Sequence, residues 1–93
     1  MAWKGALSQT LQELRVHLCQ TSPASVGARA FVVENFAEIK RANPYFPFLV
    51  REAAGAEAKL IARFDFGVEK TVSIQNDKPA EIIAKLTQLM KGT

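Results

Sequence analysis

The chain has 93 residues and a formal net charge of +3; 48% of its residues are hydrophobic and 23% are charged. A chain of this length encloses one small core, and its composition excludes disordered and collagen-like proteins. Its longest apolar runs, 30–33 and 46–50, are far shorter than the roughly 18 to 20 residues that a membrane helix requires. We therefore expect one globular domain with no direct membrane span.

Cys19 is the single cysteine of the chain, which excludes an intrachain disulfide and is typical of a reducing compartment. One cysteine gives no basis for a metal cluster, and no phosphate-binding glycine pattern occurs. We expect neither a metal nor a cofactor. The modest positive charge is spread along the chain, so it permits contact with acidic protein or RNA surfaces without requiring either.

The hydrophobic pattern predicts the element order β-α-β-β-β-α. Alternating apolar and polar residues predict strands over 11–18, 48–52, 59–66 and 70–75, and helical spacing predicts helices from between 23 and 26 to 42 and over 79–91. Pro23 suits the first turn of the first helix, and Asn43-Pro44 ends it. The stripe that this helix is expected to bury consists of Ala28, Val32, Phe36 and Ile39, with Phe31 beside them.

The first β-α-β unit is expected to form a parallel strand pair with a right-handed crossover, which places its helix on one face of the sheet. If the last helix packs on the same face, the other face is bare. The side chains expected there are Glu13, Arg15, His17, Leu49, Arg51, Lys59, Ile61, Arg63 and Asp65. Because a bare sheet face must be polar or covered by a partner, we interpret this mixed, net basic face as a docking surface.

Few residues suggest a catalytic or redox role. Cys19-Gln20-Thr21-Ser22 has the form C-x-x-S before a helix, where a thiol becomes more acidic, but one cysteine cannot run a dithiol cycle. We favour a semi-buried structural residue and keep a redox-sensitive thiol as the alternative. His17 has no second histidine, and the spacing of Asp65, Glu52 and Glu57 fixes no carboxylate pair at a cleft, so no catalytic residue is expected.

Residues 1–10 are expected to form a weakly structured N-terminal arm before a domain that spans 11–93. Trp3 lies in this arm. Two interpretations of Trp3 stay open: it anchors the arm in a partner's pocket, as aromatic residues do at interfaces, or it packs back on its own domain.

Several stretches resemble one known family. They are Leu14 to Gln20, Ser22-Pro23, Ser25, Arg29-Ala30-Phe31, Lys40 to Pro44, Pro47 to Glu52, Ala62-Arg63-Phe64 and Phe66 to Glu69, and the most specific runs from Asn43 to Glu52. Over nearly its whole length the chain resembles the small thioredoxin-like accessory subunits of mitochondrial complex I, the NADH:ubiquinone oxidoreductase. The same domain family includes small mitochondrial ribosomal proteins. The resemblance implies an α/β, thioredoxin-like fold with a four-stranded mixed sheet in the order 2-1-3-4 and two helices on one face.

The resemblance also implies a function. It implies a non-catalytic accessory subunit, peripheral on the matrix side of the inner membrane, that supports assembly and stability of the NADH-oxidising module. Its partners would be other complex I subunits, chiefly the large iron–sulfur subunit, with no nucleic acid, flavin or cluster bound. The alternatives are a ribosomal protein of the same fold that contacts rRNA and a monothiol redox protein that uses Cys19.

Two departures from the family weaken a redox role. Many relatives carry a second cysteine just after the Arg51-Glu52 pair, where this chain has Ala53. Relatives also commonly have a proline before the third strand, where this chain has Ala58. The resemblance therefore implies a fold that serves as a binding module.

Overall fold

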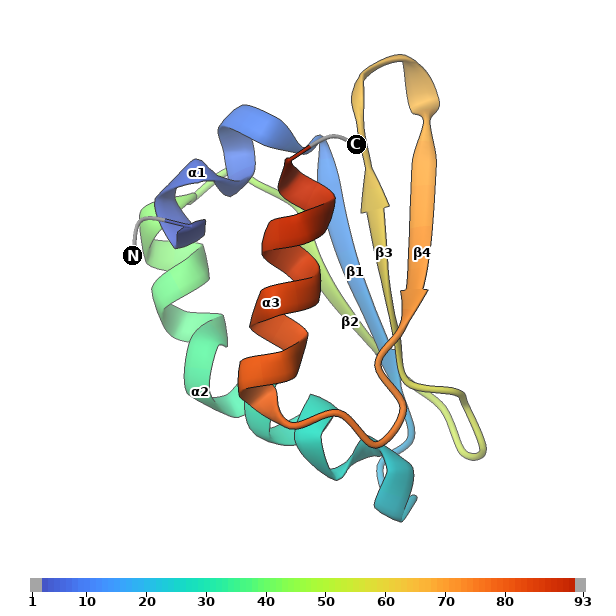
Figure 1. Ribbon diagram of the computed structural model, residues 1–93. Helices are drawn as coiled ribbons and strands as arrows, with labels where there is room; N and C mark the ends of the chain where they lie inside the picture. Colours follow the sequence, from blue (N-terminus) through green and yellow to red (C-terminus); the bar gives the residue numbers. More distant parts are fainter. Residues whose placement is uncertain (1–2, 92–93) are drawn as a thin grey trace.

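The computed structural model describes residues 3–91, and Figure 1 shows three helices packed against one side of a four-stranded sheet. The elements are α1 Trp3–Thr10, β1 Glu13–Leu18, the 3-10 turn η1 Pro23–Ser25, α2 Val26–Ala42, β2 Phe48–Glu52, β3 Lys59–Arg63, the 3-10 turn η2 Asp65–Gly67, β4 Glu69–Ser73 and α3 Pro79–Met90. The strand order is β2-β1-β3-β4, with β1 and β2 parallel and the other neighbours antiparallel. The predicted α/β fold and its sheet order are confirmed.

One apolar cluster joins the helices to the covered face of the sheet. Alternate residues of β1 point into it, and its fully buried members include Leu14, Val16, Leu60, Phe31, Ile39, Ile82 and Leu86. Burying a large apolar side chain contributes about 1.5–3 kcal/mol, so this cluster is the main source of stability. It also fixes the sheet register, since a slip of one residue would turn these side chains toward the bare face.

The buried stripe of α2 differs from the predicted one. Its buried residues are Ala28, Phe31, Asn35 and Ile39, while Phe36 is 38% exposed. Asn35 is accommodated because its side-chain amide donates to the Phe31 carbonyl at 2.8 Å. Phe36 instead covers β2, with its ring centroid 5.4 Å from that of Phe48.

Residues 3–10 form the helix α1 where the sequence predicted a weakly structured arm. Trp3 is only 7% exposed, and its ring stacks on Phe31 with centroids 6.4 Å apart. Buried Asn43 holds the helix, because its side chain accepts from the Ser8 N–H at 3.2 Å and donates to the Lys4 carbonyl at 2.5 Å. Trp3 therefore packs on its own domain, which was one of the two interpretations that the sequence left open. Residues 1–2 of the predicted arm and 92–93 of the predicted domain lie outside the described residues.

The third strand is shorter than predicted. β3 ends at Arg63, and the chain then turns through Phe66, whose φ of 66° lies in the left-handed region. Phe66 was predicted to share the buried face of this strand, but it is 100% exposed. Asp65, expected on the bare face, also falls in this turn, where it accepts a hydrogen bond from Gln12 at 2.5 Å. The turn lets β4 begin at Glu69.

Candidate partner-binding surface

The bare face of the sheet carries side chains in ordered rows. Paired residues of neighbouring strands point to the same face. The register sets Glu13 beside Arg63, Arg15 between Leu49 and Ile61, and His17 between Arg51 and Lys59. On β4, Glu69, Thr71 and Ser73 continue these rows. We call these eleven residues the open face: Glu13, Arg15, His17, Leu49, Arg51, Lys59, Ile61, Arg63, Glu69, Thr71 and Ser73.

Figure 1 shows that α1, α2 and α3 all lie on the opposite side of the sheet from this surface. Within residues 3–91, no helix covers the open face. Every predicted partner-binding residue except Trp3 lies on it. The position of this surface was predictable because the alternation in the strands separates its side chains from those of the core.

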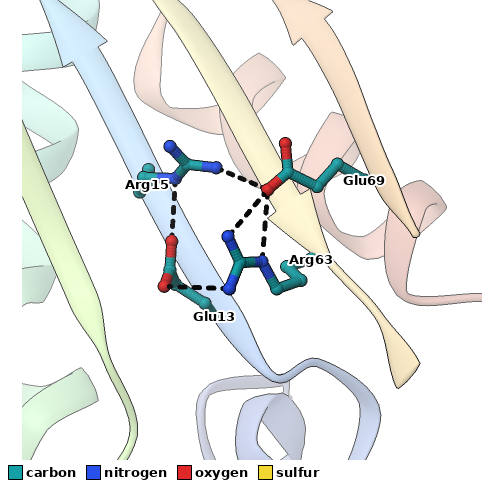
Figure 2. A network of polar contacts seen from close by, with 4 residues as sticks. All are labelled: Glu13, Arg15, Arg63 and Glu69. Atoms are coloured by element: carbon teal, nitrogen blue, oxygen red, sulfur yellow. Dashed lines mark hydrogen bonds and ion pairs between the residues drawn. The ribbon is translucent and has the colours of Figure 1, made fainter. Parts of the chain in front are cut away.

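One end of the open face is an ion-pair network (Figure 2). Arg15 lies 2.8 Å from Glu13 and 2.7 Å from Glu69, and Arg63 lies 3.0 Å from Glu69 and 4.0 Å from Glu13. Two arginines and two glutamates thus neutralise one another. Glu69 was not among the predicted partner-binding residues. Its position across the β3–β4 hairpin from Arg63 could have indicated that it lies on the same face.

The other end of the open face is a basic row formed by Arg51, His17 and Lys59. Among the described residues, neither Arg51 nor Lys59 has an ion-pair partner within 4.0 Å. Partial burial lowers the pKa of His17, and the positive charges of Lys59, Arg15 and Arg51 lower it further. The neutral imidazole is therefore favoured, and the local potential is positive.

Apolar side chains lie between the two ends. Leu49 is partly exposed, and Ile61 is 9% exposed. They flank Arg15 in the middle row of the sheet. Apolar contact area ringed by charge is typical of a protein interface and gives no arrangement for acid-base chemistry.

Cys19 follows β1 and is 3% exposed. The backbone N–H of Thr21 is the main cause that lowers the pKa of the thiol to about 7, and the Gly55 N–H, 3.3 Å from Sγ, contributes next. The Cys19 backbone is also fixed, because its N–H donates to Ser25 Oγ at 3.1 Å and its carbonyl accepts from Arg29 at 2.8 Å. The residue is therefore an enclosed part of the β1–α2 junction with an acidified thiol.

The acidic residues considered for acid-base chemistry do not all lie together. Asp65 lies at the opposite end of β3 from Glu57. No three His, Cys, Asp or Glu side chains within residues 3–91 are placed to hold a metal ion. A hollow of about 370 Å³ between α1 and residues 42–47 is lined by Ser8, Leu11 and Gln12 and has no carboxylate, histidine or thiol. None of the described helices has the length and apolarity to cross a membrane.

The family model described as "Mitochondrial ribosomal protein L51 / S25 / CI-B8 domain" matches residues 28–79. NADH dehydrogenase (ubiquinone) 1 alpha subcomplex subunit 2 of Arabidopsis thaliana is 42% identical over 92 residues, which cover 99% of this chain and 95% of that protein. The chain belongs to this subunit 2 family. The Mus musculus member is 45% identical over 88% of this chain and 83% of its own length. The 10.5 kDa subunit of NADH-ubiquinone oxidoreductase of Neurospora crassa is 35% identical, with 99% and 98% covered.

Two alanines distinguish this member of the subunit 2 family from the pattern that the sequence resemblance implied. Leu18 and Glu52 form the last pair of the parallel strands β1 and β2, so the next residues, Cys19 and Ala53, are neighbours. A cysteine at position 53 would therefore lie next to Cys19. Ala58 donates its backbone N–H to Gln75 Oε1 at 2.7 Å, a bond that proline cannot make. In this chain Ala58 is buried, and exposed Ala53 donates its backbone N–H to the Leu18 carbonyl at 3.1 Å.

Proposed function

We propose that the chain is a non-catalytic accessory subunit of mitochondrial complex I that docks to other subunits through the open face. Relatives named as NADH dehydrogenase subunits match it over nearly their full length. The observation that carries the docking role is the geometry of the sheet, which has one face packed under helices and one face with apolar residues between charged ends. A protein contact is the arrangement that this surface suits best.

We also propose a position for the subunit within complex I. It lies on the matrix arm, peripheral to the membrane, and supports assembly and stability of the NADH-oxidising module. Its chief partner is the large iron–sulfur subunit, and it carries no flavin, cluster or active site of its own. The family resemblance supports these points, and the separation of Asp65 from Glu57 and the single cysteine agree with a binding role.

Deletion of the chain tests the proposal. We expect native electrophoresis of mitochondrial membranes to show less assembled complex I, while the complex that remains keeps its turnover rate per molecule. Expression of the chain should restore the amount of complex. A normal amount of complex with reduced turnover would instead indicate a catalytic role.

A ribosomal protein is the second candidate, because the description of the matching family model includes ribosomal members. The open face argues against it, since Glu13 and Glu69 neutralise its arginines and would repel RNA phosphates. Ribonuclease-sensitive sedimentation of the chain with mitochondrial ribosomes would favour this candidate. Sedimentation with complex I after ribonuclease treatment would favour ours.

A monothiol redox protein is the third candidate, and the lowered pKa of Cys19 is the observation in its favour. Burial argues against it, because a nucleophilic thiol must reach its substrate and Cys19 is 3% exposed. Replacement of Cys19 by serine decides between the two roles. The accessory role predicts a normal amount of assembled complex in Cys19→Ser, whereas a redox role predicts loss of function.

A further inference from the structure

The two ends of the open face differ in whether their charged side chains form ion pairs within the chain. At the Glu13 end, each arginine already contacts two carboxylates of the same chain. A partner that approached this end would have to compete with those ion pairs. Among residues 3–91, no carboxylate forms an ion pair with the basic row of Arg51, His17 and Lys59.

We infer that the basic row is the site where a partner protein places an acidic segment, with one carboxylate at Arg51, a second at Lys59 and a hydrogen-bonding group over His17. This inference rests on the proposed function and specifies the chemistry of the partner at that surface. Oppositely charged groups across an interface fix its register and exclude other partners.

The sheet geometry sets the spacing of the two carboxylates. Arg51, His17 and Lys59 occupy three adjacent strands in one row. Neighbouring strands lie about 4.8 Å apart, so the outer two positions are separated by about 10 Å. Two acidic residues seven positions apart on a helix have nearly this separation, because each residue advances the helix axis by about 1.5 Å. Leu49 in the next row is partly exposed and then meets an apolar residue of the same segment.

The observations favour protein over RNA as the occupant. An RNA strand presents a phosphate at every nucleotide, so its neighbouring phosphates would meet Glu13 and Glu69 at the other end of the face. An acidic protein segment has its charges at discrete positions and can place neutral or basic residues there. Only the protein segment is complementary to both ends of the open face.

Carbodiimide cross-linking of intact, purified complex I tests the inference. This reagent joins an amine to a carboxylate in direct contact, and Lys59 supplies the amine. We expect mass spectrometry to find Lys59 joined to an Asp or Glu of another subunit. We also expect an amine-reactive label to modify Lys59 roughly tenfold less in the intact complex than after denaturation, as for a lysine held in an interfacial ion pair.

Paired variants provide a second measurement. Arg51→Gln with Lys59→Gln removes two charges from the basic row, and Arg41→Gln with Lys91→Gln removes the same charge from exposed positions on the helical side. We expect the first variant to lower the fraction of the chain in complex I by roughly fivefold or more and the control to leave it unchanged. Neutralisation at these partly or fully exposed positions leaves the core intact.

The outcomes separate the inference from the proposed function. If the chain resides in complex I but Lys59 is labelled as freely as after denaturation, the inference fails and the proposed function stands. Equal incorporation of both variants would overturn it as well. If the chain is absent from complex I, whether or not it sediments with ribosomes, both proposals fail.

Discussion

Arg15 on β1 contacts Glu69 on β4 at 2.7 Å, although β3 lies between these two strands. The same carboxylate oxygen accepts from Arg63 of β3 at 3.0 Å (Figure 2). One glutamate thus ties three strands together on the surface that no described helix covers. The arginines expected to meet a partner are therefore used largely within the chain, and the uncompensated charge lies at the basic row.

A double-mutant cycle of Arg15→Ala and Glu69→Ala tests this ion pair in the isolated full chain. Because Glu69 is 38% exposed, solvent screens the pair, and we expect a coupling free energy of about 0.5–1 kcal/mol. Urea unfolding of the four proteins measures it. The coupling should shrink in 1 M salt, since salt screens exposed charges; a salt-independent coupling would contradict the assignment.

Gly27 is a position where the fold has no room for a side chain. A Cβ there would lie 1.7 Å from the Asp77 carbonyl oxygen, at the place where the loop before α3 meets the start of α2. We expect Gly27→Ala to lower the free energy of unfolding by about 3 kcal/mol or more, because backbone must move. Gly5→Ala is the control, since nothing lies within 4 Å of that Cβ, and it should stabilise α1 by up to about 1 kcal/mol. Similar effects of both variants would rule out the close approach.

Asn43 attaches α1 to the end of α2. Asn43→Ala removes the side-chain bonds to the Ser8 N–H and the Lys4 carbonyl, while the Ile39 carbonyl keeps only the backbone N–H of residue 43, so we expect a loss of about 2–3 kcal/mol. Trp3, the single tryptophan, reports the change because its fluorescence should shift to longer wavelength as α1 loosens. As a control, Glu38→Gln breaks the exposed ion pair with Lys4, leaves the contact of Lys4 with the Trp3 ring in place, and should cost less than about 1 kcal/mol. An unchanged emission spectrum in Asn43→Ala would contradict this role.

Cys19 should make stability depend on pH above neutrality. Its pKa falls from 9.0 to about 7 on folding, so the unfolded chain binds more protons between these pH values and the free energy of unfolding rises from pH 7 to pH 9. Below pH 7 this contribution is lost. Urea unfolding at pH 6 and pH 8.5 should show the rise in the wild type and not in Cys19→Ser. The same pH dependence in both proteins would exclude the thiol as its source.

Much of the fold was predictable because its signals are local. Leu14, Val16 and Leu18 alternate with polar residues, and Asn43-Pro44 ends α2 where the sequence predicts. The helix α1 was missed because Gly5 and polar residues dilute its pattern, although Trp3, Leu7 and Leu11 recur every four residues. The end of β3 was missed because Phe66 adopts a left-handed conformation that is uncommon for an aromatic residue.

The position of the open face was predictable from the sequence, but the ion pairing on it was not. Strand alternation alone placed Arg15, Arg63 and Lys59 on one face. The contact between Arg15 and Glu69 depends on the order β1-β3-β4 and on how the β3–β4 hairpin pairs, and neither follows from charge spacing. The separation of the open face into a compensated end and a basic row therefore required the three-dimensional arrangement.

The docking role of the open face can be checked in an electron cryomicroscopy reconstruction of assembled complex I that contains this chain. We predict that the open face, including Leu49 and Arg51, lies against another protein subunit and is withdrawn from solvent there. A reconstruction in which this face borders solvent, while the helical side makes the contacts, would contradict the account.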